Sequence, residues 1–78
     1  METRTLEIEV PPQPRREEFG EGMDADRRFH LHYRRWRAEV SSRINAKMPA
    51  GFGLYKWRAE ERAESGWVAV AEIVGESD

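Results

Sequence analysis

The sequence predicts an α+β fold of order β-α-β-β, with one long helix packed on a three-stranded, mostly antiparallel sheet. Three observations lead to this prediction. Apolar and polar residues alternate from Thr5 to Val10, apolar residues recur every three or four positions from Asp24 to Lys47, and an alternating hairpin runs from Phe52 to Val74. We expect the helix to lie across the sheet and to bury its apolar stripe against the hairpin.

The length and composition predict a single small domain over residues 1–78. Such a chain buries only about 60% of its unfolded surface, so we expect no deep active-site cleft, and a homodimer would add stability. The chain contains no cysteine, which excludes disulfides and thiolate metal sites. No apolar run has the length of a membrane span or a signal segment, and we expect a cytoplasmic protein that does not enter a membrane.

The first strand is predicted to end at a proline-rich segment. Leu6, Ile8 and Val10 alternate with polar residues, which is typical of a half-buried strand. Residues 11–23 are rich in proline, glycine and charge, and we interpret them as a loop that Phe19 anchors to the core.

The helix is predicted from Asp24 to Lys47, with Asp24 as the N-cap and Pro49 and Gly51 ending it. One alternative stays open, because residues 28–33 also alternate and would form a strand if the helix began near Arg34. The apolar stripe on which the helix prediction depends consists of Ala25, Phe29, Tyr33, Trp36, Val40 and Ile44.

The hairpin turn is predicted to place Gly66 in the left-handed conformation, after a type I turn. This turn sets a register with small and aromatic residues on one face, and with charged side chains covering valines on the other. The pairs expected on the first face are Ala63 with Trp67, Glu61 with Ala69, Ala59 with Ala71 and Trp57 with Ile73.

The first strand is expected to pair antiparallel with the strand from Trp67 to Val74, which would place the most apolar strand in the middle. A parallel crossover beside the strand that starts at Phe52 is the alternative. Exchange of the first strand between two chains is a further alternative, because the loop that follows it is long. Residues 75–78 are expected to form a flexible tail.

The charge is uneven, although the net charge is only −2. Residues 1–23 carry three basic and six acidic side chains, residues 24–58 carry nine and three, and residues 59–78 carry one and six. Acidic ends that neutralise the basic centre within the fold are the favoured interpretation, and an acidic partner is the alternative. Arginine outnumbers lysine eleven to two, which is typical of a GC-rich coding sequence such as that of an actinobacterium or its phage.

No catalytic, metal or phosphate-binding pattern stands out, and we predict a non-enzymatic protein without a cofactor. His30 and His32 would share a face only in a strand, since on a helix they diverge by about 200°. The glycines of the stretch PAGFG lack the lysine and the following helix of a phosphate loop, so we interpret them as a turn.

Partner binding is predicted for the outward face of the helix. Arg27, Arg34 and Arg35 lie there around Leu31, and arginine beside an apolar residue suits contact with an acidic macromolecule. We expect a small interaction module, an adaptor or an inhibitor, whose partner is another protein. The alternative is a nucleic-acid-binding domain that uses the same basic face, which the acidic overall composition disfavours.

Overall fold

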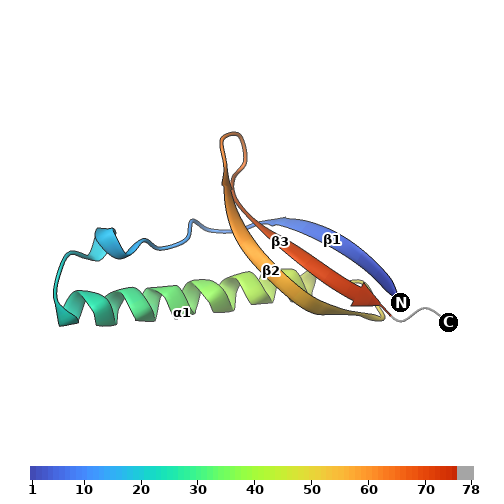
Figure 1. Ribbon diagram of the computed structural model, residues 1–78, viewed down its shortest axis with the longest axis horizontal. Coiled ribbons are helices and arrows are strands. Elements are labelled where there is room, and N and C mark those ends of the chain that lie inside the picture. The colour runs from blue at the N-terminus through green and yellow to red at the C-terminus, as the bar shows by residue number, and fades with distance from the viewer. Residues whose placement is uncertain (76–78) are drawn as a thin grey trace.

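The computed structural model describes residues 1–75, and its elements follow the order β-α-β-β (Figure 1). The strands form one antiparallel sheet of order β1-β3-β2, which confirms the α+β fold and the preferred position of the first strand. The elements are β1 (Glu2–Glu9), the 3-10 helix η1 (Arg16–Phe19), α1 (Met23–Ala46), β2 (Phe52–Arg62) and β3 (Gly66–Gly75). Gly75 is therefore a strand residue and not part of a tail, and residues 76–78 lie outside the described residues.

The helix α1 is continuous from Met23 to Ala46, so the alternative of a strand over residues 28–33 is wrong. The prediction of Asp24 as the N-cap is also wrong. Gly22 takes that position with a φ of 98°, and no side chain caps the helix. Because the chain enters the helix through this glycine, Asp24 and Asp26 fall within the first turn, where a carboxylate favours the positive end of the helix dipole.

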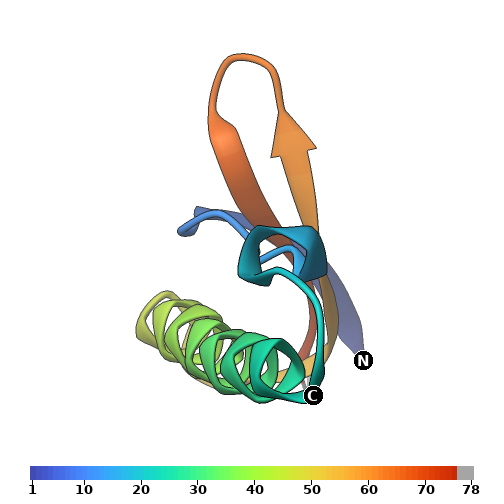
Figure 2. The same ribbon diagram turned by 90° about the vertical axis from the view of Figure 1, so that its left-hand side faces the viewer.

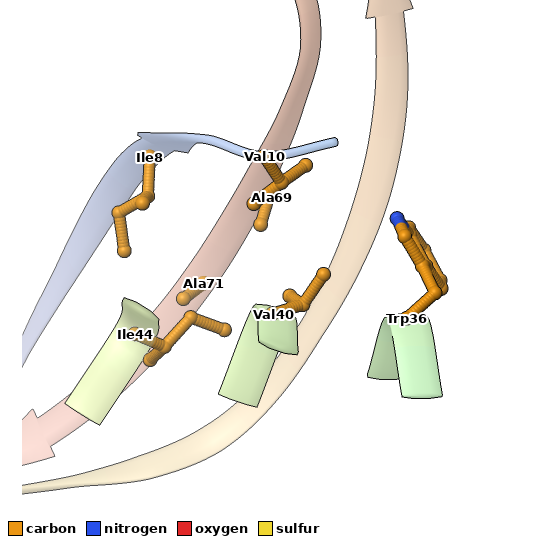
Figure 3. Close-up of a cluster of buried hydrophobic side chains, with 7 residues drawn as sticks. All are labelled: Ile8, Val10, Trp36, Val40, Ile44, Ala69 and Ala71. Atoms are coloured by element: carbon orange, nitrogen blue, oxygen red, sulfur yellow. The ribbon is translucent and has the colours of Figure 1, made fainter. Parts of the chain in front are cut away.

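The core lies between the sheet and the C-terminal half of α1 (Figure 3). Trp36, Val40 and Ile44 recur at a spacing of four and face the sheet, so they form one buried stripe. The small side chains of β3 allow the helix backbone to come close to the central strand. The sheet residues of this cluster are Ile8, Val10, Ala69 and Ala71.

The N-terminal half of α1 projects beyond the sheet (Figure 1), and this end of the helix faces the viewer in Figure 2. The molecule consequently measures 53 × 27 × 16 Å. The expectation that the hairpin covers the whole apolar stripe is wrong for this half, because η1 lies over it instead. Phe19 packs edge-on against Phe29 with ring centroids 5.9 Å apart, so it anchors the loop to this half of the helix and not, as predicted, to the core. Phe29 and Tyr33 remain half-buried.

The hairpin has the predicted faces but not the predicted register. Gly66 has a φ of 75°, as expected, yet it pairs with Arg62, and Ala59 pairs with Ala69 in place of Ala71. The strands are therefore displaced by two residues from the predicted pairing. This displacement keeps each side chain on its predicted face, since side chains alternate with a period of two. A bulge between Leu54 and Lys56 then shifts the register again near the start of β2.

The outer face of the sheet is covered by charged side chains. Val68 and Val70 are each only 5% exposed, although they point away from the helix. They lie opposite Glu60 and Arg58, whose long side chains cover them, as the sequence predicts. The ion pairs on this face are Arg58 with Glu60 at 2.8 Å, Arg62 with Glu60 at 3.0 Å, Lys56 with Glu72 at 3.2 Å, and Arg62 with Glu7.

Candidate interaction face on the helix

The four residues predicted to bind a partner lie on the side of α1 opposite the core stripe. At about 100° per residue, Leu31 falls on the far side of the helix from Val40. All four side chains are exposed, and Leu31 is 46% exposed. We call this surface the Arg/Leu face; it consists of Arg27, Leu31, Arg34 and Arg35.

The arginines of the Arg/Leu face have no acidic partner among the described residues. Within residues 1–75, none of Arg27, Arg34 and Arg35 makes an ion pair or a side-chain hydrogen bond. The acidic side chains pair with cations of the sheet, the loop and the last turns of the helix instead. Neutralisation of the basic centre by the acidic ends, the interpretation that the sequence favoured, is confirmed for Lys56 and Arg58, which pair with Glu72 and Glu60, but it is wrong for this part of the helix.

Other arginines of α1 are held by the fold. Arg28 donates a hydrogen bond to the backbone oxygen of Phe19 at 3.2 Å, and the guanidinium of Arg37 lies 5.4 Å from the ring centroid of Trp57. Arg43 pairs with Glu39, one helical turn away, at 3.0 Å. These three arginines therefore help to hold the helix in place. The arginines of the Arg/Leu face make no such contact with the described residues.

Ala38 extends this surface beyond the four residues predicted from the sequence. Ala38 is exposed and lies seven residues after Leu31 and four after Arg34, so it continues the same side of the helix toward the C-terminus. The helical period contains this signal, but an alanine carries no charge that draws attention to it. Together, Leu31 and Ala38 form a narrow apolar strip with guanidinium groups on both sides.

His30 and His32 both lie on α1 and contact different aromatic side chains. The rings of His32 and Phe19 are tilted by 53°, with centroids 5.1 Å apart, whereas His30 lies near Phe29 at 5.5 Å. Over residues 1–75, no group of three or more His, Cys, Asp or Glu side chains is arranged to hold a metal ion. No helix in this described part of the chain is long and apolar enough to cross a membrane.

The free guanidinium groups suit particular ligands. An unpaired arginine offers two parallel donors to a carboxylate or a phosphate, and such charge-assisted bonds are stronger than neutral ones. No family model matches the chain, and neither the curated proteins nor the solved structures contain a significant match. The exposure and the positive charge of the Arg/Leu face are therefore the features that indicate a function.

Proposed function

We propose that the chain is a small non-enzymatic interaction module, an adaptor or an inhibitor, that binds an acidic protein through the Arg/Leu face. The observation that supports this most is the combination of the exposed Leu31 with three arginines that pair with no acidic side chain of residues 1–75, on a helix that projects from the sheet. Binding would replace the hydration of free cations and an exposed leucine with carboxylates and an apolar contact.

An acidic protein accounts for Leu31 and Ala38 better than a nucleic acid does. Protein interfaces usually combine an apolar centre with a polar rim, and arginine is among the residues enriched in them. The apolar strip between the arginines has this arrangement. Phosphate binding would use the arginines but would gain little from Leu31.

A nucleic-acid-binding domain is the second candidate. It is favoured by the absence of any acidic residue between Arg27 and Ala38, a stretch that contains five arginines. A projecting helix with this charge could follow a phosphate backbone. The net charge of −2 for the whole chain argues against it.

Two variants of the Arg/Leu face separate these candidates. Leu31→Ala should lower the affinity for a protein partner by about tenfold, which corresponds to roughly 1.4 kcal/mol of lost binding free energy. It should leave nucleic-acid binding nearly unchanged. Arg34→Ala combined with Arg35→Ala should reduce the salt slope of duplex binding by about 2. The measurements are affinity capture from the source cells and electrophoretic mobility shifts with DNA and RNA across a salt series.

Arg15→Ala is the matched control, because Arg15 is an exposed arginine outside α1 whose ion pair with Glu61 is long at 3.4 Å. It should leave either interaction unchanged, and no variant should change the free energy of unfolding by more than about half a kcal/mol. If folded variants of the Arg/Leu face still bind fully to a partner that the wild type captures, the binding site does not lie on this face.

A homodimer would leave this face accessible if it formed through the sheet, because the Arg/Leu face lies on the opposite side of the helix. The proposal also places the module in the cytoplasm, as the sequence predicts. Fractionation of the source cells tests that location.

A further inference from the structure

The strand β1 is an edge strand with a regular backbone, although four of its eight side chains are charged. It pairs with β3 on one side only, and its eight residues contain no proline, lysine or bulge. The opposite edge, β2, carries a bulge near Tyr55 and the cations Lys56 and Arg58. Because a bulge interrupts the backbone of an edge, β2 is less suited to strand addition, whereas β1 presents a regular row of hydrogen-bonding groups to another strand.

The hydrogen-bonding groups of β1 that face away from the sheet can be identified from the ladder. The backbone N–H of Val10 donates to the carbonyl oxygen of Trp67 at 3.1 Å. Antiparallel pairs alternate, so the even-numbered residues of β1 bond to β3, and Thr3, Thr5 and Glu7 direct their N–H and C=O groups outward. Among the described residues, these three outward pairs of groups have no hydrogen-bond partner.

A groove lies between this open edge and the C-terminal end of α1. Its apolar lining comes from Leu6 and Ile8 of the strand and Ala46 of the helix, while Arg43 and Lys47 provide positive charge on the helix side. Arg43 also donates a hydrogen bond to the backbone oxygen of Glu9 at 3.0 Å, which holds its guanidinium beside the edge. An incoming strand would therefore place its side chains against apolar groups and near cations.

We propose that β1 pairs antiparallel with β1 of a second copy of the chain, with the two-fold axis passing through Leu6. The outward groups of Thr5 then bond to those of the partner's Glu7, and Leu6 lies directly opposite the partner's Leu6. At the end of the groove, the partner's Glu2 comes beside Val10, where its carboxylate approaches Arg43. Each contact occurs twice, as the symmetry of such a dimer requires.

Neighbouring registers fit less well. An axis at Glu7 would oppose two glutamates directly, which is destabilising. An axis at Thr5 would place Leu6 opposite the partner's Arg4, so the direct contact between the two leucines would be lost, whereas the Leu6 axis keeps it and places Arg4 opposite the partner's Ile8. The Leu6 axis joins two three-stranded sheets into one and extends the small core of each chain.

Single-cysteine variants test both the pairing and its register, because the chain contains no cysteine of its own. Leu6→Cys places two thiols opposite each other at a Cα separation of about 4.5 Å, within the range that a disulfide bridges. It should form a covalent dimer on oxidation. Arg4→Cys is the matched control on the same face of the same strand. Its two thiols would be four residues apart, roughly 14 Å, and should not join.

Thr5→Pro tests the hydrogen bonds themselves. It removes an outward N–H without removing a bond to β3, so the fold should survive. In sedimentation equilibrium the wild type should have twice the mass of the 9.1 kDa chain, and Thr5→Pro should have the mass of one chain. Glu61→Pro, which removes the corresponding outward N–H on β2, should remain a dimer.

A wild-type chain that sediments as a monomer at several hundred micromolar would overturn the proposal. So would a folded Thr5→Pro dimer, or cross-linking of Arg4→Cys as efficient as that of Leu6→Cys. If Thr5→Pro does not fold, the comparison between the two cysteine variants decides the outcome. None of these results depends on the Arg/Leu face, so the two proposals fail separately.

Discussion

At the scale of single residues, Trp36 joins three parts of the molecule. Its indole N–H donates to the backbone oxygen of Pro11 at 2.8 Å, and its ring lies 5.7 Å from Tyr33 and 5.8 Å from Trp57. The side chain is only 6% exposed. It therefore ties the proline-rich segment and β2 to the helix at the point where the sheet ends.

Trp36→Ala should lower the free energy of unfolding by about 3–5 kcal/mol, because it leaves a cavity and removes the bond to Pro11. Trp36→Phe keeps most of the apolar contact and should lose less, about 1–2 kcal/mol. Urea denaturation measures both. Equal stability of the alanine variant and the wild type would mean that this tryptophan is not part of the core.

At the scale of elements, the two halves of α1 are stabilised differently. The C-terminal half packs on the sheet, whereas η1 covers the N-terminal half, of which Tyr33 also packs against the core. A helix without tertiary cover is marginal in water, so Phe19 should set the stability of the first turns. This difference matters because Arg27 and Leu31 of the Arg/Leu face lie on the less protected half.

Phe19→Ala should speed amide hydrogen exchange in residues 23–33 by about tenfold, which corresponds to roughly 1.4 kcal/mol of lost local stability. Exchange in residues 40–44 should stay unchanged. Tyr55→Ala provides the control, since Tyr55 is 71% exposed and lies on the far edge of the sheet. Uniform acceleration along the helix would instead indicate that α1 opens as one unit.

The elements also show what the sequence could predict. The helical and alternating periods identified every long element and both faces of the hairpin, because these patterns reflect burial directly. The register was predicted wrongly because a glycine in the left-handed conformation fits hairpin loops of different lengths. The length of the loop, which sets the strand pairing, cannot be read from Gly66 alone. The N-cap was missed because Gly22 offers no side chain to recognise. The Arg/Leu face was predicted as exposed, but its lack of ion pairs depends on distances that only the fold provides.

At the scale of the whole molecule, the charged outer face of the sheet should make stability depend on pH. Hydrogen bonds from Arg58 and then from Arg62 lower the pKa of Glu60 below its ordinary value of 4.5. The unfolded chain therefore binds a proton at this site before the folded chain does. The resulting stabilisation is fully present above about pH 4.5 and is lost as the pH falls through the lowered pKa of the folded state.

Unfolding experiments from pH 7 to pH 3 should show this loss, and Glu60→Gln should reduce the slope below pH 4.5. Glu64→Gln is the control, because Glu64 lies in the turn and makes no ion pair with any described residue. A slope that both substitutions reduce equally would assign the effect to net charge and not to the arginine contacts.

The placement of charge across the thickness of the molecule has a consequence for how it meets a partner. The helix α1 carries six basic and three acidic side chains, whereas the three strands carry four and six. The chain therefore has an electric dipole directed from the sheet toward the helix, despite its small net charge. In the field of an acidic surface this dipole exerts a torque that turns the helix forward before contact, so association should be oriented, and faster at low ionic strength.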